Sequence, residues 1–176
     1  MLAVFSGVLP EVGGSRTWRK RPFKKYHEEH QSALFAYALS QKAYCYQWEY
    51  WCGEHADYDC AVRCHLPQGR LVYKAVQLKE LVPAGLNPQS SLQCLINGLV
   101  KYRARPGEES LVVSIYINRA ACICFRELSI PKLQIEQLWL YGHLDLHSCF
   151  LVGNLLGHPK EYHFRYPHFQ IESLTE

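Results

Sequence analysis

Two short polar motifs face each other in a stretch that reads as a β-hairpin, residues 57–80. Asp57 and Asp59 lie two positions apart on its first arm, and Gln77 and Lys79 have the same spacing on its second. Because strand side chains alternate between the two faces of a sheet, each pair shares one face. Symmetry about the turn places Asp59 opposite Gln77, with Cβ atoms about 5 Å apart, and Asp57 opposite Lys79. The sequence therefore predicts a cluster of two carboxylates, an amide and an ammonium group. Such a cluster is either a functional site or an ordinary cross-strand ion pair and hydrogen bond.

The rest of the hairpin supports this register. Pro67, Gln68 and Gly69 supply the residue types of a tight turn, and a turn centred on Gln68 gives the pairing just described. A slip of one residue would move every side chain to the other face and scatter the cluster. The opposite faces of the two arms are mainly apolar and can pack on a core; they carry Tyr58, Cys60, Val62, Cys64, Val72, Val76 and Leu78.

The order of elements along the chain predicts an α/β fold. Residues 26–44 are apolar enough for a largely buried helix, and Glu28 and Glu29 fall in its first turn, where carboxylates suit the helix dipole. Residues 86–109 contain a second helix, which we expect Asn87 to cap. Helix, three strands, helix, strand and further strands, in this order, predict one central mixed sheet. Strands are expected at residues 45–53, in both hairpin arms, and at residues 110–118, 133–142, 148–156 and 161–167.

Size and composition are those of one ordinary globular domain: 176 residues, of which 48% are apolar and 20% charged. No apolar run approaches the roughly 20 residues of a membrane span. No basic segment precedes the N-terminal apolar patch, so we expect no signal peptide and a cytoplasmic location with reduced cysteines. The spacing of the eight cysteines is poor for zinc. His143 and His147 read as surface histidines.

The net charge of +3 is unevenly distributed. Residues 1–26 hold six of the 19 basic residues and one of the 16 acidic residues, so residues 27–176 carry a net charge of −2. We predict a basic N-terminal arm over residues 1–26 and a single domain over residues 27–176. The arm can lie along a phosphate backbone or simply be solvated. Its candidate nucleic-acid contacts are Arg16, Arg19, Lys20, Arg21, Lys24 and Lys25.

With "DYD" on the second expected strand and "VQLKE" on the third, the chain resembles the PD-(D/E)XK nuclease superfamily. The common core of that superfamily is α-β-β-β-α-β, and the D…QxK variant is typical of Mrr-type restriction endonucleases. The resemblance covers roughly residues 27–118. It implies a restriction-endonuclease-like core, to which the C-terminal strands are an addition.

The resemblance also implies a metal site with Mg²⁺ or Mn²⁺ as cofactor. Asp59 is our first choice as principal ligand, and Asp57 is the second candidate. Gln77 offers a carbonyl oxygen where most relatives carry an acid. The helix carboxylate is Glu28 or Glu29; we favour Glu29 because small residues follow it one and two turns later.

In such a site Lys79 would orient or deprotonate the attacking water, or stabilise the charged transition state. The implied activity is metal-dependent hydrolysis of nucleic acid, with DNA as the first expectation, by an endonuclease of a defence, repair or mobile-element system. A homodimer is compatible with this, because each site of such enzymes cuts one strand. Two alternatives stay open. One is an inactive module of the same fold that binds nucleic acid or a protein partner, and the other is an unrelated α/β protein in which the hairpin match is chance.

Overall fold

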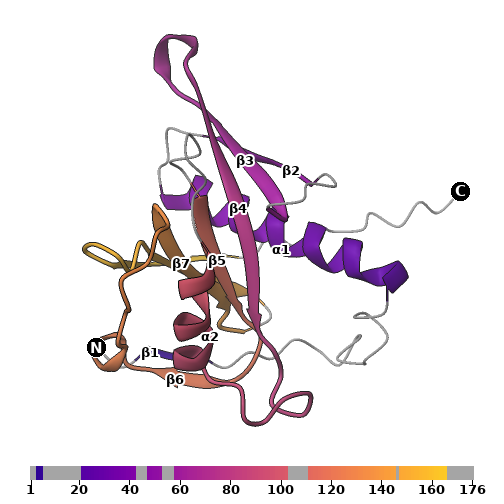
Figure 1. The fold of residues 1–176 in the computed structure, drawn as a ribbon. Coiled ribbons are helices and arrows are strands. Elements are labelled where there is room, and N and C mark those ends of the chain that lie inside the picture. Colours follow the sequence, from indigo (N-terminus) through magenta and orange to yellow (C-terminus); the bar gives the residue numbers. More distant parts are fainter. Residues whose placement is uncertain are drawn as a thin grey trace, which may run out of the picture.

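The computed structural model describes residues 3–5, 21–42, 47–52, 58–102, 111–145 and 147–165. Figure 1 shows a twisted sheet with helix α1 crossing one face and helix α2 lying on the other. The predicted α/β class with a mixed sheet is therefore confirmed. In chain order the helices and strands are β1 (Ala3–Phe5), α1 (Arg21–Lys42), β2 (Trp48–Trp51), β3 (Cys60–His65), β4 (Leu71–Leu81), α2 (Leu92–Gly98), β5 (Leu111–Ile117), β6 (Ala121–Ile123), β7 (Gln137–His143), β8 (Ser148–Gly153) and β9 (Lys160–Arg165).

Seven of these strands form the main sheet, in the order β2-β3-β4-β5-β7-β8-β9. The first three pair antiparallel, β5 is parallel to β4, and β7 is parallel to β5. Strands β8 and β9 then extend the sheet antiparallel. A parallel pair needs a crossover connection, and α2 lies in the connection between β4 and β5. The long β3–β4 hairpin projects beyond the body of the sheet (Figure 1).

The sheet separates two hydrophobic layers. On one face, Leu34, Phe35 and Ala38 of α1 pack with Val112 and Tyr116 of β5, among others. On the other face, α2 packs against the alternate residues of β5, because neighbouring side chains of a strand point to opposite faces. Both layers are closed to water over β5, which is why its sequence is a continuous apolar run.

The predicted second helix is shorter than expected, and its predicted cap is wrong. Helix α2 begins at Leu92, and Ser91 caps it by accepting a hydrogen bond from the backbone N–H of Cys94 at 3.1 Å. Asn87 lies in the turn before the helix, where its side-chain oxygen accepts from the N–H of Ser90 at 3.2 Å. The chain turns twice between β4 and α2, so the first good capping residue in sequence is not the one at the helix start.

The prediction that His143 lies at the surface is also wrong. His143 ends β7 on the face covered by α1, where it is 6% exposed and stacks on His30 at 6.4 Å between ring centroids. Burial, and to a smaller extent His30, lower the pKa of His143 to about 4. Burial likewise lowers the pKa of His30, and its neighbour His27 lowers it further. His147, in the turn that follows, is exposed as predicted.

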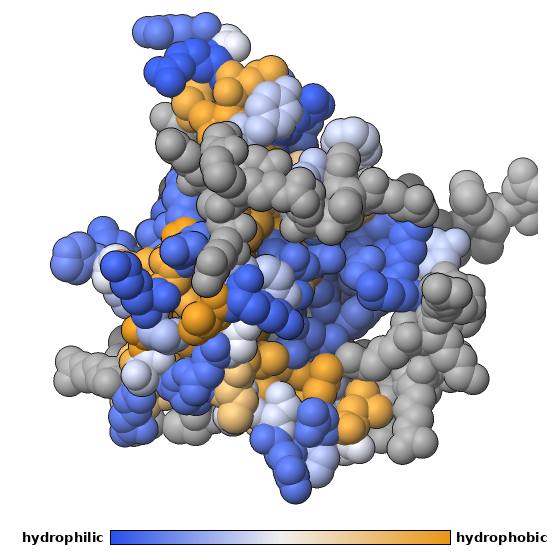
Figure 2. All heavy atoms as spheres, viewed as in Figure 1, coloured by the Kyte–Doolittle hydropathy of each residue, from blue (hydrophilic) through white to orange (hydrophobic). Residues whose placement is uncertain are grey.

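Figure 2 shows hydrophilic residues gathered over the N-terminal half of α1 and hydrophobic residues near the tip of the projecting hairpin. Near that tip Leu71 and Tyr73 are 43% and 56% exposed.

Replacing Gly142 by alanine is expected to destabilise the fold. A Cβ atom there would lie 2.8 Å from the backbone oxygen of Ile117 and 2.9 Å from the ring of Phe150, both too close for real contacts. Overpacking of this kind costs about 1–3 kcal/mol of unfolding free energy. Gly98→Ala is the matched control, because a methyl group at that position would meet no atom within 4 Å and alanine favours a helix. Urea unfolding of both variants tests this, and equal stabilities would contradict the packing described.

Stability is expected to fall as the pH drops from about 6.5 to about 4. In that window the unfolded chain binds a proton at His143 that the folded chain, with its pKa of about 4, does not bind. This group alone should remove about 2–3 kcal/mol of unfolding free energy between pH 7 and pH 4.5. Denaturant unfolding at both pH values, in wild type and His143→Gln, should give a smaller pH effect in the variant. His147→Gln should keep the wild-type effect; a His143→Gln variant with an unchanged pH effect would contradict the assignment.

Candidate active site

The hairpin has the predicted register. Strands β3 and β4 pair from Cys60 with Val76 through to His65 with Leu71, and the N–H of Leu66 donates to the oxygen of Arg70 at 2.8 Å to close the turn. Within the turn, the residues at positions 68 and 69 have positive φ angles of 67° and 73°, which glycine at the second position adopts without strain. The pairing extrapolates by one residue to Asp59 opposite Gln77, as expected from the sequence.

Asp59 is fixed to β4 by its carboxylate. The oxygen Oδ2 accepts a hydrogen bond from the side-chain amide of Gln77 and another from the backbone N–H of Leu78, the latter at 2.7 Å. The backbone N–H of Asp59 also donates to the oxygen of Val76 at 3.0 Å. The second carboxylate oxygen, Oδ1, accepts no hydrogen bond from the residues that the structure describes. Asp59 therefore has one oxygen that holds the hairpin together and one that is available to a ligand.

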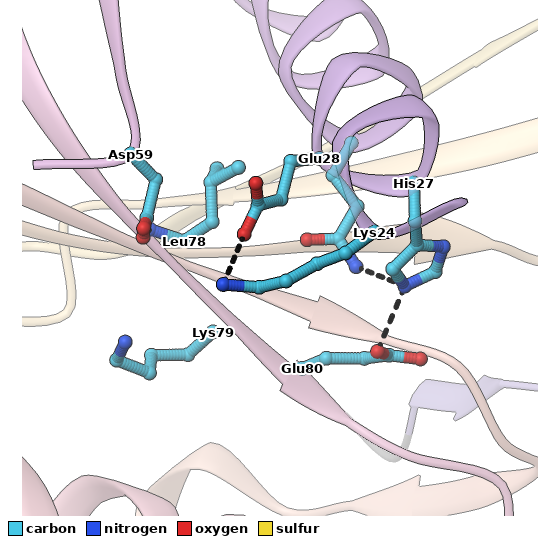
Figure 3. A pocket seen from close by; sticks show the side chains of 8 residues that line it. Lys24, His27, Glu28, Asp59, Leu78, Lys79 and Glu80 are labelled. Carbon is cyan, nitrogen blue, oxygen red and sulfur yellow. Dashed lines mark hydrogen bonds and ion pairs between the residues drawn. The ribbon is translucent and has the colours of Figure 1, made fainter. Parts of the chain in front are cut away.

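A pocket of about 320 Å³ lies beside Asp59, between α1 and β4. Figure 3 shows the side chains of α1 reaching toward β4, where Lys79 and Glu80 leave the strand in opposite directions. Seven of the eight lining residues have polar side chains, and they combine carboxylates with cations from both elements. The lining residues are Lys24, His27, Glu28, Gln31, Asp59, Leu78, Lys79 and Glu80.

Glu28 is the helix carboxylate that lines this pocket, and its carboxylate forms an ion pair with Lys24 at 3.2 Å, one helical turn earlier. Glu29, which we favoured from the sequence, is half-buried but does not line the pocket. Asp57 lies outside the described residues. The structure thus brings Asp59, just before β3, close to Glu28 on α1 and to two residues of β4, Gln77 and Lys79.

Lys79 points to the α2 side of the sheet. Its ammonium group lies 4.9 Å from the centre of the Tyr102 ring, and that of Lys101 lies 5.3 Å from the same ring. A cation is attracted to the face of an aromatic ring. Lys79 therefore offers a localised positive charge at the edge of the pocket.

Glu80 points to the α1 side and links three elements. Its carboxylate contacts Nε2 of His27 on α1 at 2.9 Å and accepts from the side-chain amide of Asn118, just after β5, at 2.7 Å. The side-chain amide of Gln31 contacts the same His27 nitrogen at 2.8 Å. Sequence reasoning missed this network. Two signals could have found it: Glu80 lies two residues after the core residue Leu78, and His27 and Gln31 have the i, i+4 spacing of one helix face.

Of the six predicted nucleic-acid contacts, only two have side chains that the structure describes. Lys24 and Lys25 are exposed in the first turns of α1, and Lys24 also lines the pocket. Arg21 is the first residue of α1, and Arg16, Arg19 and Lys20 lie outside the described residues. Of the described lysines of α1, Lys24 is thus the one that lines the pocket, and it is paired with Glu28.

The cysteines beside the site are free thiols. The thiol of Cys52 donates to the hydroxyl of Ser32 at 3.2 Å, next to Cys60. Burial, and to a smaller extent the neighbouring carboxylate of Asp59, raise the pKa of Cys60 to about 12, so this thiol stays protonated. A cysteine binds a metal ion as the thiolate. The carboxylate oxygens of Asp59 and Glu28 are therefore better metal ligands here than the protonated thiol of Cys60. In the parts of the chain that are described, no cluster of three or more His, Cys, Asp or Glu side chains could hold a metal ion.

Comparison of the chain with protein-family models, with curated proteins and with solved structures finds no match. Neither α1 nor α2, the helices of the described ranges, is both long and apolar enough to cross a membrane.

Proposed function

We propose that this chain is a metal-dependent nuclease of the PD-(D/E)XK type, with a D…QxK site made of Asp59, Gln77 and Lys79. The observation that carries the proposal is the contact of Asp59 with Gln77 and the N–H of Leu78, beside a pocket that Glu28 and Lys79 also line. The contact between Asp59 and Gln77 alone would be an ordinary surface contact. The convergence of Asp59, Glu28 and Lys79 on one pocket is what an active site requires.

The topology supports the same proposal. The elements α1, β2, β3, β4, α2 and β5 follow each other in the order α-β-β-β-α-β, with the first three strands antiparallel and β5 parallel to β4. This is the order of a restriction-endonuclease-like core. In the proposal, β7, β8 and β9 are an extension of that core at one edge of the sheet.

A hard divalent cation such as Mg²⁺ or Mn²⁺ fits the donors at this position. The available oxygen of Asp59, the carboxylate of Glu28, the side-chain carbonyl of Gln77 and the backbone carbonyl of Leu78 are the oxygen ligands that such ions prefer. Because Mg²⁺ keeps several waters, one or two carboxylates suffice. When bound, the ion would supply charge neutralisation at a phosphate and an activated water. We assign the helix carboxylate to Glu28 because it lines the pocket, and keep Asp57 as the candidate for a second hairpin ligand.

Cationic side chains would bind the phosphates of the substrate. We assign Lys79 to stabilising the negative charge that develops on the phosphate, or to orienting the attacking water. Lys24 is paired with Glu28 in this structure, and it is free to contact a backbone phosphate once that carboxylate serves a cation. We assign further phosphate contacts to Lys25 and to the basic residues of the arm. DNA is the substrate we propose first, and an intracellular endonuclease acting as a homodimer is the corresponding biological form.

A second candidate function is an inactive module of this fold that binds nucleic acid or a protein partner. Two contacts favour it. Gln77 is neutral and donates its amide to one oxygen of Asp59, and Lys24 already neutralises Glu28, so both carboxylates have a partner without a cation. A cation bound by Glu28 would have to displace Lys24.

Cleavage by wild type and by Lys79→Ala tests the proposal. With Mg²⁺ or Mn²⁺ the wild type should cut at least one of four substrates: supercoiled plasmid, linear duplex, single-stranded DNA or RNA. EDTA should abolish the cutting. Loss of a positioned acid–base or charge-stabilising group should slow it by about 10²–10⁴-fold in Lys79→Ala. Lys101→Ala is the matched control, because that lysine contacts the same Tyr102 ring and lies outside the pocket. No cutting by a folded wild type would favour the inactive module.

Gln77→Glu should make stability depend on metal. In EDTA the new carboxylate repels Asp59 and loses the amide donor, which should cost about 1–3 kcal/mol of unfolding free energy. Addition of Mg²⁺ or Mn²⁺ should recover most of this loss, because two adjacent carboxylates bind a divalent cation more tightly than a carboxylate and an amide. Melting temperatures of wild type and variant, with and without metal, measure both effects. A variant whose melting temperature does not respond to metal would contradict a cation site at Asp59.

A further inference from the structure

A second pocket, of about 300 Å³, lies under the C-terminal half of α1, on the same face of the sheet as the main core layer. Its walls come from α1 and from β2, β3, β4, β5 and β7, and they are mainly apolar. Three aromatic rings form much of the lining: Phe35 on α1, Trp48 on β2 and Trp139 on β7. None of its lining residues lines the pocket beside Asp59. Apolar hollows of this kind are poor sites for water and good ones for an apolar group.

Two of the polar groups at this pocket are already satisfied. The ammonium of Lys74 donates to both carboxylate oxygens of Glu136, at 2.7 and 2.6 Å. The side-chain oxygen of Gln137 accepts the indole N–H of Trp139 at 2.8 Å. A ligand would therefore find few donors or acceptors inside, which disfavours a nucleobase with its polar edge and favours a plain hydrocarbon ring.

Lys42 differs from these groups. It is the last residue of α1, and its ammonium group lies 4.6 Å from the centre of the Trp139 ring, at the rim of the pocket. Across the described ranges, no carboxylate forms an ion pair with it. Partial burial, and to a smaller extent the positive charge of Lys160 on β9, lower the pKa of Lys42. The helix C-terminus favours a cation here, but it does not neutralise two lysines that are close enough to repel each other.

We propose that this pocket binds a small aromatic carboxylate, with its ring among Phe35, Trp48 and Trp139 and its carboxylate on Lys42. The ring gains apolar burial and contact with aromatic faces. The carboxylate gains a partly desolvated cation and relieves the repulsion between Lys42 and Lys160. The volume lies at the lower end of the range for ligand pockets, which limits the ligand to one or two fused rings. This binding site does not depend on the nuclease function.

Binding of 2-naphthoate to the full chain, followed by isothermal titration calorimetry, tests the proposal. We expect saturable binding of one molecule per chain. The uncharged 2-naphthamide should bind at least fivefold more weakly, because it lacks the charge that pairs with Lys42. Lys42→Met keeps the side-chain stem and removes the charge, so it should weaken 2-naphthoate at least fivefold and leave 2-naphthamide unchanged.

Two further variants separate specific binding from other causes. Lys132→Met, at an exposed lysine away from the pocket, should bind 2-naphthoate as the wild type does. Val72→Phe fills part of the pocket from β4 and should abolish binding while circular dichroism reports an intact fold. Absence of 2-naphthoate binding by the folded wild type would overturn the proposal. Equal affinities for the acid and the amide, or unchanged binding in Lys42→Met, would also overturn it.

Discussion

The carboxylate of Asp59, held by Gln77 and by the N–H of Leu78, is the contact on which the candidate site depends. This contact joins the residue that precedes β3 to the middle of β4, and so it holds the two strands in register at the start of β3. Because it consumes one oxygen only, the same group that sets the register still presents a ligand oxygen to the pocket. A one-residue slip would bury Asp59 and expose Cys60, both at a large cost in free energy. The apolar face of the hairpin therefore protects the geometry of its polar face.

Strand β4 places polar side chains on both faces of the sheet at this point. Gln77 and Lys79 belong to the α2 side, and Glu80, between α1 and Asn118, belongs to the other. The contact of Glu80 with His27 connects the helix that carries Glu28 to the strand that carries Lys79. Groups on separate elements can act together only if such supporting contacts hold them in place. The network is thus a structural reason for a helix carboxylate to stay near the hairpin.

Much of this arrangement could be predicted from the sequence, because local rules determine it. The turn at Gln68 and Gly69 and the period of two in the arms were enough for the register of Asp59 and Gln77. The long apolar stretch was enough for α1. Features that depend on distant segments were not predictable in this way. The pairing of β1 with β6 joins segments more than 100 residues apart, and neither segment is long enough to have a pattern of its own.

The choices that the sequence left open or got wrong have a common physical cause, which is competition between good local candidates. Asn87 and Ser91 are both suitable caps, and only the path of the chain between β4 and α2 decides for Ser91. Glu28 and Glu29 are neighbours on α1, and the rotation of the helix against the sheet decides which one lines the pocket. His143 could end a strand in solvent, but α1 covers that end of β7. Each decision is made by packing, which the sequence pattern does not contain.

Titration of the protein with Mn²⁺, with the free-ion signal followed by electron paramagnetic resonance, measures whether Asp59 presents an oxygen to a divalent cation. We expect saturable binding at one site per chain in the wild type and binding at least tenfold weaker in Asp59→Asn, which keeps the shape of the side chain. Glu161→Gln, at a half-buried glutamate paired with His163 away from the pocket, should bind as the wild type does. Equal Mn²⁺ binding in wild type and Asp59→Asn, or none in the wild type, would exclude a cation site at Asp59.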